Sequence, residues 1–271
     1  MVSNGPLRPR SHGVNAKMPS SPDPVRVSIV IAVRNEVANI AACVDSVRWA
    51  SEILVADHGS SDGTVEQAMR FGATVVAAAD APTIGALRNA AIAQARNGWV
   101  LVVDADERGT PDVERAVRDA IAHPSSTAYR VPRKNFFLGR EIRHGGWETD
   151  RPVRLFESAL RYDDSMVHEH VIVKGVPATL DAPLLHAPYA SLDVYFEKFV
   201  RYSRWWAEEQ MRRGRRASIS AILFKPPARF ITMFILRLGF LDGARGAVLA
   251  ALAASSVCAK YVRLWAMQCE S

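Results

Sequence analysis

Val100-Leu-Val-Val-Asp104-Ala105-Asp106-Glu107 joins four apolar residues to three acidic side chains within the next four positions. The apolar part is typical of a strand that is buried on both faces. Carboxylates are hard oxygen ligands suited to Mg²⁺ or Mn²⁺, which usually keep water and phosphate oxygens in the rest of their coordination shell. An Asp-x-Asp after a strand therefore predicts a metal-bound diphosphate, with a turn or a helix cap as the alternative role for these acids.

Similar apolar strands precede this segment and alternate with helical patterns. Strands are expected at 27–33, 52–56, 74–77 and 99–103, and helices follow from about 36, 61 and 84, the last running to about Arg96. Thr110-Pro111-Asp112 then starts another helix. This alternation predicts an α/β fold with a mostly parallel sheet covered by helices on both faces. Ligands bind beyond the carboxyl ends of the strands in such sheets, where Asp57 and Asp104 lie.

Four motifs occur in one order along the first half of the chain. They are Ser28-Ile-Val-Ile-Ala-Val-Arg-Asn-Glu36, Val55-Ala-Asp57-His-Gly-Ser-Ser-Asp-Gly-Thr64, Ala86-Leu-Arg88-Asn89 and Asp104-Ala-Asp106. In this order they resemble the motifs of family 2 glycosyltransferases with the GT-A fold, a Rossmann-like α/β fold. Trp147-Glu-Thr-Asp150, Arg154-Leu-Phe156, Val167-His168-Glu169 and Leu185-His186, with the aromatic helix after Ser191, resemble the subgroup of lipopolysaccharide core β-1,4-glucosyltransferases. The resemblance covers about Val25 to Trp265.

This resemblance implies a binding site for a nucleoside-diphosphate sugar. Val33, Asn35 and Glu36 fall in the family's first nucleotide-binding loop, although Glu36 is also placed to be a solvated acid that opens a helix. Asp57 matches the residue that accepts a hydrogen bond from the uracil N–H; the alternative is a turn or helix-capping residue. Arg88 matches a position near the base and the diphosphate, unless it lies on the exposed face of an Ala-rich helix.

The resemblance also implies a divalent cation, Mg²⁺ or Mn²⁺. Asp106 is the expected ligand, with Asp104 near the ribose or assisting through a water molecule. The metal would offset the charge that builds on the departing diphosphate. In several GT-A enzymes a late His completes the metal shell, which makes His186 a third candidate, with a structural hydrogen bond as its alternative. Glu107 ranks below both Asp residues because it also suits the turn that follows.

An inverting transfer needs a carboxylate that removes the proton of the acceptor hydroxyl. In many relatives this base is the Asp of a Glu-Asp motif, and this chain departs from that pattern. Glu169 is the expected replacement, with Asp150 in reserve. His168 either orients the base, lies near the diphosphate or makes a structural hydrogen bond.

Composition limits the domain organisation and the compartment. With 271 residues, 49% of them hydrophobic, the chain suits one catalytic domain and a smaller appendage. We expect a disordered leader at 1–24 without a secretory signal, a GT-A domain at 25–190 and a helical region at 191–271. The three cysteines form neither a metal-spacing motif nor an even disulfide framework, which indicates a reduced cytoplasm, and Cys43 is expected in the core.

The region after Ser191 combines aromatic, basic and apolar segments. An aromatic stripe leads into Arg212-Arg213-Gly214-Arg215-Arg216, and the apolar segments beyond it are interrupted by charges and by Pro226-Pro227. No apolar stretch approaches the roughly 20 residues of a spanning helix. We therefore expect amphipathic helices on an anionic membrane surface, in keeping with the net charge of +6. The alternatives are a self-packed helical subdomain or a homodimer interface, and no nucleic-acid-binding motif is present.

Together these patterns predict an inverting, metal-dependent transferase that uses a UDP-sugar. The resemblance implies glucose as the sugar and a lipid-linked saccharide, such as the heptose of the lipopolysaccharide inner core, as the acceptor. It also implies a peripheral location on the cytoplasmic face of a bacterial inner membrane. A nucleotidyltransferase is one alternative, but Arg34-Asn35-Glu36 does not resemble a Gly-rich phosphate loop. A non-catalytic membrane-binding module is the other.

Overall fold

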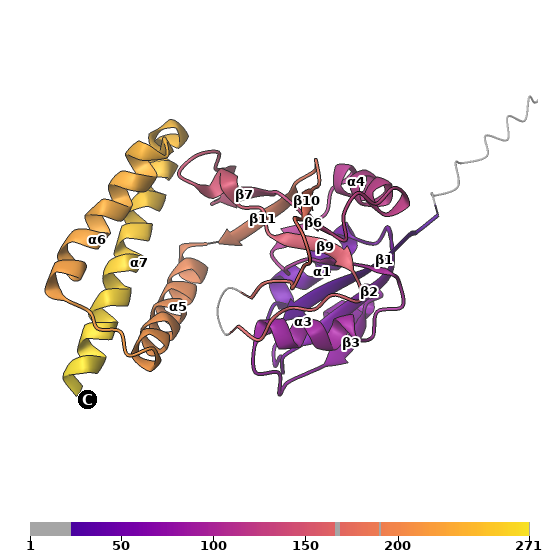
Figure 1. Cartoon of the computed structure of the whole chain (residues 1–271), viewed down its shortest axis with the longest axis horizontal. Helices are drawn as coiled ribbons and strands as arrows, with labels where there is room; N and C mark the ends of the chain where they lie inside the picture. Colours follow the sequence, from indigo (N-terminus) through magenta and orange to yellow (C-terminus); the bar gives the residue numbers. More distant parts are fainter. Residues whose placement is uncertain (1–22, 166–168, 190, 271) are drawn as a thin grey trace, which may run out of the picture.

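A seven-stranded sheet lies at the centre of one lobe, and three helices form the other (Figure 1). The structure is a computed structural model that describes residues 23–165, 169–189 and 191–270, so most of the expected leader and His168 lie outside the described residues. The strands are β1 Val25–Val33, β2 Ala50–Asp57, β3 Thr74–Ala77, β4 Trp99–Val102, β6 Ala128–Arg130, β9 Val153–Glu157 and β10 Ala178–Thr179, in the order β10-β6-β9-β4-β1-β2-β3. β1 to β4 are mutually parallel, whereas β9 runs antiparallel to both of its neighbours.

Helices cover both faces of this sheet, as the alternating pattern predicts. They are α1 Val37–Ser46, α2 Thr64–Arg70, α3 Ile84–Ile92 and α4 Pro111–Ala122. Alternate side chains of β1 point to opposite faces. Ile29 and Ile31 pack in one core cluster with α1, α2 and α4, and Val30 packs in another with α3. Cys43 lies fully buried in the first cluster, as expected.

The helix expected to reach Arg96 ends at Ile92 instead. Beyond it, the backbone N–H of Arg96 donates to the carboxylate of Glu52 over 2.9 Å, and the Arg96 side chain donates to the same carboxylate. Ser28 on β1 also donates to Glu52. The buried Glu52 thus draws the chain out of the helix and toward the amino end of β4.

A four-stranded sheet packs beside the carboxyl ends of the parallel strands. Its strands are β5 Glu107–Arg108, β7 Arg133–Phe137, β8 Arg140–Glu141 and β11 Leu184–Tyr189, in the order β5-β11-β7-β8. A short 3₁₀ helix, η1, spans Trp147–Thr149. β11 lies between β5 and β7, so that His186 faces Glu107 on one side and Asn135 on the other. β11 then leads into the helical lobe.

The helical lobe consists of α5 Leu192–Arg212, α6 Ile219–Ile231 and α7 Gly243–Glu270, with two short turns, η2 Thr232–Leu236 and η3 Gly239–Asp242, between α6 and α7. Both α6 and α5 pack against α7, and α6 runs alongside it (Figure 1). Ser191 caps α5 by accepting the N–H of Val194, as its sequence context predicts. The predicted helical C-terminal region is confirmed.

One expectation about this lobe is wrong. Ile219–Leu236 and Gly239–Glu270 are continuous helical stretches of 18 and 32 residues, and by length and composition both are long and apolar enough to cross a membrane. Pro226 and Pro227 do not break α6, although neither can donate a backbone N–H to the preceding turn. The sequence pattern predicts that the two prolines interrupt the apolar segment, whereas in the structure both lie inside one continuous helix.

The Glu52 carboxylate provides a pH test of the fold. Burial alone would raise the pKa of Glu52, but its hydrogen bonds from Ser28 and Arg96 outweigh burial and lower it. Because the pKa of Glu52 is lower in the folded state than in the unfolded state, where it is about 4.3, the ionised carboxylate stabilises the fold above about pH 4.3. This contribution is lost as the pH falls from the unfolded pKa through the folded one. We expect Glu52→Gln to lose about 2 kcal/mol at pH 7 and to show a flatter acid dependence than the wild type, in urea titrations between about pH 7 and pH 3. Glu66→Gln, on α2, is the control, and an equal acid slope for Glu52→Gln and the wild type would contradict the assignment.

Candidate active site

The candidate site lies where β1, β2 and β4 end. Val33 at the end of β1 pairs with Asp57 at the end of β2, and β4 on the other side of β1 ends at Val102, two residues before Asp104. Asp57 and Asp104 therefore leave the sheet at the same edge, on either side of β1. The expectation that the strands deliver both acids to one edge is met.

The loop after β1 is bonded to the loop after β2. The Asn35 N–H donates to the Ser60 hydroxyl, and the Asn35 side-chain oxygen accepts the Ser61 N–H, both over 2.9 Å. The N–H of Glu36 donates to the Thr64 hydroxyl over 2.8 Å. Asn35 adopts a φ of 57°, a left-handed conformation that Asn tolerates better than most residues. These bonds hold the exposed tip of the β1 loop in one shape.

Asp57 is buried, and its carboxylate accepts hydrogen bonds from the turn that follows it. Its carboxylate accepts the N–H groups of Gly59 and Ser60 over 3.0 to 3.2 Å. The turn-forming alternative is thus present in the structure. The carbonyl of Val33 accepts the N–H of His58, which joins the same turn to the end of β1. Glu36 accepts a hydrogen bond from the side chain of Asn39, at the start of α1.

Three arginines surround Asp104. Arg88 on α3 donates to its Oδ1 over 2.7 Å, Arg133 on β7 donates to its Oδ2 over 2.7 Å, and Arg154 on β9 donates to the same Oδ2. The Arg88 side chain is 8% exposed, so its alternative as an arginine on an open helix face is wrong. Both oxygens of Asp104 are consequently occupied by guanidinium groups.

Glu107 belongs to the same cluster. Its side chain is 0% exposed and pairs with Arg133 and Arg154. Its other oxygen accepts the backbone N–H of Asp104 over 2.7 Å, so it also closes the turn after β4. Glu107 therefore stabilises the position of Asp104 and has no free face toward a ligand.

The two candidate bases lie on opposite sides of this cluster. Glu169 pairs with Arg88, and Asp150, which follows η1, pairs with Arg133 over 3.1 Å. Gly85 in the first turn of α3 lets the Glu169 segment approach, since a Cβ at Gly85 would lie 2.7 Å from the carbonyl oxygen of Asp163. Each candidate base thus shares one arginine with Asp104 as an ion-pair partner.

The cluster keeps Asp104 ionised. Burial alone would raise the pKa of Asp104, but Arg154, Arg88 and Arg133 outweigh it and hold that pKa well below its usual range. Burial likewise opposes the charge on Arg154, yet Asp104 and Glu107 raise its pKa well above the usual value. The buried charges therefore remain mutually paired at neutral pH.

Asp106 has different neighbours. Its Oδ1 lies 3.6 Å from Nε2 of His186, and its Oδ2 lies 3.2 Å from Nζ of Lys198 on α5. The Lys198 ammonium also donates to the carbonyl of Pro188 over 3.0 Å and lies over the ring of Tyr189. Asp106 therefore faces the helical lobe, whereas Asp104 faces the sheet.

A hydrogen-bond chain fixes the tautomer of His186. The Asn135 side chain donates to the carbonyl of Trp147 over 2.8 Å, which leaves the amide oxygen of Asn135 to accept the Nδ1–H of His186 over 2.6 Å. Burial and the charge of Arg133 lower the pKa of His186, so its ring is neutral near pH 7. The lone pair of Nε2 then points to the same side as Asp106. A carboxylate oxygen and a neutral imidazole nitrogen lying together favour a cation between them.

The donor set fits a divalent cation at Asp106 and His186 but not at Asp104. No group of three or more His, Cys, Asp or Glu side chains that could hold a metal occurs within the described residues. Mg²⁺ and Mn²⁺ sites at nucleotides commonly use one or two protein ligands and take the rest from phosphate and water. The two described ligands therefore suit a cation completed by a diphosphate, whereas both oxygens of Asp104 accept hydrogen bonds from arginines, which disfavours a direct metal role for Asp104.

Sequence reasoning misses four contributors to this site. Arg133, Asn135 and Lys198 carry no motif, and Arg154 belongs to a motif that gives it no specific role. The one available signal is charge, because three acids at a buried strand end require cations nearby. The pattern does not say which of the chain's 34 Lys and Arg residues supply them.

Comparison with known proteins identifies the class. The model of the family "Glycosyl transferase family 2" matches residues 28–170, which is more than half of the chain. The protein therefore belongs to glycosyl transferase family 2 and is a glycosyltransferase. This membership confirms the family expected from the motifs and favours sugar transfer over the nucleotidyltransferase and non-catalytic alternatives.

Two curated relatives extend the similarity into the helical lobe. The lipopolysaccharide core biosynthesis glycosyltransferase LpsC of Rhizobium meliloti is 27% identical over 250 residues, covering 85% of this chain and 91% of the relative. An uncharacterized glycosyltransferase of Rickettsia typhi is 25% identical over 239 residues, covering 82% and 81%. Glucosyl-3-phosphoglycerate synthase from Mycobacterium tuberculosis, crystallised with Mn²⁺ and UDP, gives a TM-score of 0.37 at 20% identity, over 49% of this chain and 57% of that one. At this TM-score the last match supports no inference about donor or metal.

Removing the charge of Asp104 tests the arginine cluster. Asp104→Asn leaves three largely buried guanidinium groups with too few carboxylates, and we expect it to lower the unfolding free energy by about 3 kcal/mol in urea titrations. Asp119→Asn, an exposed position on α4, is the control and should change stability by less than about 0.5 kcal/mol. Equal stability of the two variants would show that the cluster does not stabilise the fold.

Proposed function

We propose that the protein is an inverting, divalent-cation-dependent glycosyltransferase that transfers a sugar from a UDP-sugar. The observation that supports this most directly is the pairing of Asp106 with a neutral His186 beside the ends of β1, β2 and β4. Family membership supplies the reaction class, and the site supplies a place for a nucleotide and a cation at the sheet edge where such ligands bind.

The donor nucleotide would lie across the loops after β1 and β2. Asn35 and Glu36 lie at the tip of the loop after β1, and Val33 and Asp57 lie where β1 and β2 end. The carboxylate of Asp57 retains acceptor capacity beyond its two backbone N–H partners, which suits the N–H of uracil. Arg88, which is paired with Asp104, would then attract the negatively charged diphosphate.

Asp106 and His186 would hold Mg²⁺ or Mn²⁺, with Asp104 orienting Arg88 and Arg133 instead of binding the ion. When bound, the ion supplies Lewis-acid stabilisation of the diphosphate leaving group. The ammonium of Lys198 now lies against Asp106 and adds a further positive charge at this position. The arginines and Lys198 together favour the departing diphosphate electrostatically.

Glu169 is the proposed base. In an inverting transfer it would accept the proton of the acceptor hydroxyl while that oxygen attacks the anomeric carbon from the side opposite the diphosphate. Its pairing with Arg88, the residue proposed to attract the diphosphate, supports this role. Asp150, paired with Arg133, is the alternative base.

The acceptor is proposed to be a lipid-linked saccharide of the lipopolysaccharide core, and the transferred sugar glucose. Support for the acceptor comes from LpsC, which is similar over 85% of this chain, including part of the helical lobe. A lipid-linked acceptor places the enzyme at the inner face of the inner membrane. The apolar exposed surface of α6 and α7 fits that location.

We propose that α6 and α7 lie on the membrane surface instead of crossing it. Lys225 and Arg229 lie within the first apolar stretch, and each charge at the bilayer centre costs at least about 2.5 kcal/mol. Pro226 and Pro227 also remove two helix hydrogen bonds that hydrocarbon would not replace. Only 6% of the first stretch is buried in the protein, which disfavours a self-packed subdomain. A homodimer interface is the remaining alternative.

Asp106→Ala tests the donor and metal assignment. We expect it to abolish sugar transfer and to remove the Mn²⁺-dependent part of UDP binding, because His186 alone is a weak site. Calorimetric titration with UDP in Mn²⁺ and in EDTA measures this directly. Asp119→Ala, exposed on α4, should behave as the wild type. Unchanged Mn²⁺-dependent binding in Asp106→Ala would refute the metal assignment.

Replacing Glu169 tests the base separately from binding. We expect Glu169→Gln to lower kcat by roughly 10² to 10⁴-fold while the Kd for UDP stays within about a factor of two, since a base acts on the acceptor and not on the nucleotide. Asp150→Asn should retain most of the turnover. If Asp150→Asn loses turnover and Glu169→Gln keeps it, the two roles must be exchanged.

A further inference from the structure

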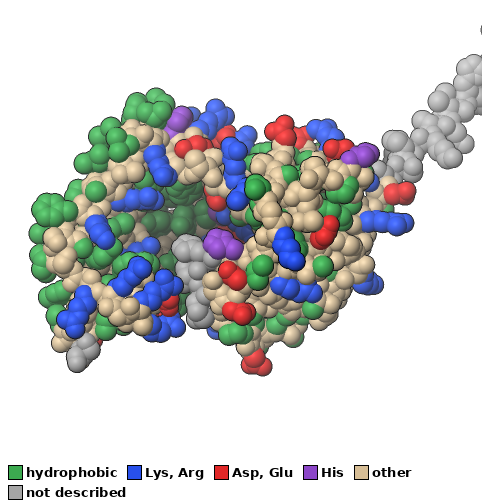
Figure 2. All heavy atoms as spheres, viewed as in Figure 1, with side chains coloured by type: hydrophobic (Ala, Val, Ile, Leu, Met, Phe, Trp, Pro, Cys, Tyr) green, Lys and Arg blue, Asp and Glu red, His purple; other side chains and the backbone are tan. Residues whose placement is uncertain are grey.

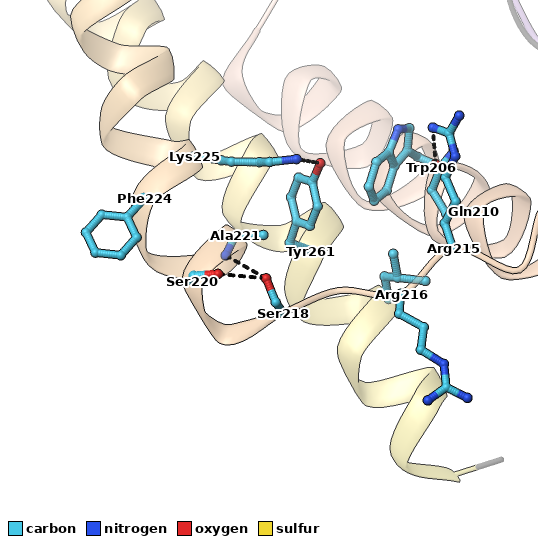
Figure 3. A pocket seen from close by; sticks show the side chains of 11 residues that line it. Trp206, Gln210, Arg215, Arg216, Ser218, Ser220, Ala221, Phe224, Lys225 and Tyr261 are labelled. Atoms are coloured by element: carbon cyan, nitrogen blue, oxygen red, sulfur yellow. Dashed lines mark hydrogen bonds between the residues drawn. The ribbon is translucent and has the colours of Figure 1, made fainter.

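A cavity of about 680 Å³ opens among α5, α6 and α7, and none of the site residues described above lines it. Figure 3 shows Trp206 from α5, Lys225 from α6 and Tyr261 from α7 turned toward one another along its wall. Arg215 and Arg216, in the turn between α5 and α6, also line it. Phe224 lines it too, so the cavity combines three cations with three aromatic side chains.

The three cations are available to an anion. Among the described residues, no carboxylate forms an ion pair with Arg215, Arg216 or Lys225, whereas Arg212 and Arg213 just before them both pair with Glu209. Arg215 donates to the neutral side-chain oxygen of Gln210, over 3.0 Å. Within the described part of the chain, the charges inside the cavity thus lack counterions, while the adjacent charges outside it have one.

The remaining polar groups at the cavity strengthen this preference. Ser218 caps α6 by accepting the N–H of Ala221, so the positive end of a 13-residue helix begins at the cavity. Lys225 donates to the Tyr261 hydroxyl and lies 4.3 Å from the centre of that ring. A compact anion with several acceptor oxygens, such as a phosphate, matches this arrangement.

The surroundings of the cavity are apolar. Phe224, which lines it, is 70% exposed, and Leu223 beside it is 60% exposed. Figure 2 shows hydrophobic and basic side chains interspersed over the helical lobe. Exposed apolar side chains continue along both helices at Ile231, Ile235, Leu236, Val248, Val262 and Trp265. A soluble anion would leave this surface in water, whereas a lipid would cover it.

We propose that this cavity binds the phosphodiester headgroup of an anionic phospholipid, with the acyl chains lying against α6. Lys225 contacts the phosphate, Arg215 and Arg216 add positive charge at the rim of the cavity, and Trp206 and Tyr261 lie at headgroup depth, where amphipathic aromatic rings are favoured. This inference rests on the membrane association proposed above and not on the transfer reaction. It assigns that association a defined lipid site in addition to a general attraction between charges.

Vesicle sedimentation of the full chain tests the proposal. The probes are phosphatidylcholine vesicles with and without phosphatidylglycerol at about one part in three. We expect Arg216→Gln/Lys225→Met to lower the partition coefficient on anionic vesicles roughly 30-fold, which is about 1 kcal/mol per charge at 1.4 kcal/mol per factor of ten. Binding to neutral vesicles should not change. Unaltered far-UV circular dichroism and UDP binding will show that the variant is folded.

Arg212→Gln/Arg213→Gln is the matched control, because it also removes two positive charges, from arginines beside the cavity that do not line it. It should lose less than about 3-fold in partitioning, with both arginines already paired to Glu209. Equal losses in the two double variants would show diffuse attraction and overturn the lipid site. No loss in the cavity variant would overturn it as well.

Two further measurements distinguish a bound lipid from a soluble anion and from a second copy of the chain. Inorganic phosphate at constant ionic strength should not displace the protein from anionic vesicles, and full displacement would assign the cavity to a soluble anion. A wild-type dimer in analytical ultracentrifugation that the cavity variant abolishes would assign it to a second copy. If the wild type binds neither vesicle, the proposed membrane association fails too, while UDP binding in Mn²⁺ still reports on the proposed transferase.

Discussion

Two carboxylates close together at the end of β4 are the constraint around which the site is built. The Glu107 side chain is fully buried and that of Asp104 is 27% exposed, and an isolated buried charge costs several kcal/mol. Arg88, Arg133 and Arg154 offset that cost from α3, β7 and β9. One ionic cluster thereby joins a helix, the large sheet and the small sheet.

The cluster separates the roles of the two Asp residues in the Asp-x-Asp motif. Both oxygens of Asp104 accept hydrogen bonds from arginines, so Asp104 holds the charges that would surround the proposed diphosphate. Asp106, two residues on, points instead to His186 and Lys198. In an extended segment, side chains two positions apart point the same way, so Asp104 and Asp106 would share one direction there. They do not, because the turn closed by Glu107 reorients Asp106.

The sequence predicts what depends on local pattern. The apolar runs of β1, β2 and β4 indicate buried strands, and the positions of Asp57 and Asp104 follow from where those runs end. The end of α3 at Ile92 is not predictable in this way, because it depends on Glu52, 44 residues from Arg96 in the chain. Local composition cannot reveal such a partner.

The same reason explains the missed site residues. Arg133 and Lys198 are ordinary basic side chains in their own segments, and only the pairing of β7 with β11 and the docking of α5 bring them to the acids. The local rule that proline ends a helix fails at Pro226-Pro227, which both lie inside α6. The roles of Glu169, Asp150 and Asp57 stay predictions.

Lys198 has a consequence for how the two lobes communicate. It belongs to α5, yet its ammonium lies on Oδ2 of Asp106, beside the Oδ1 that faces His186, so the cation proposed at Asp106 and His186 would meet the Lys198 charge at short range. Linkage is reciprocal: a shift of α5 would alter the affinity of the proposed cation for Asp106, and the bound cation would alter by the same free energy how firmly α5 is held. The proposed cation site and the position of α5 would therefore be thermodynamically coupled through a single side chain.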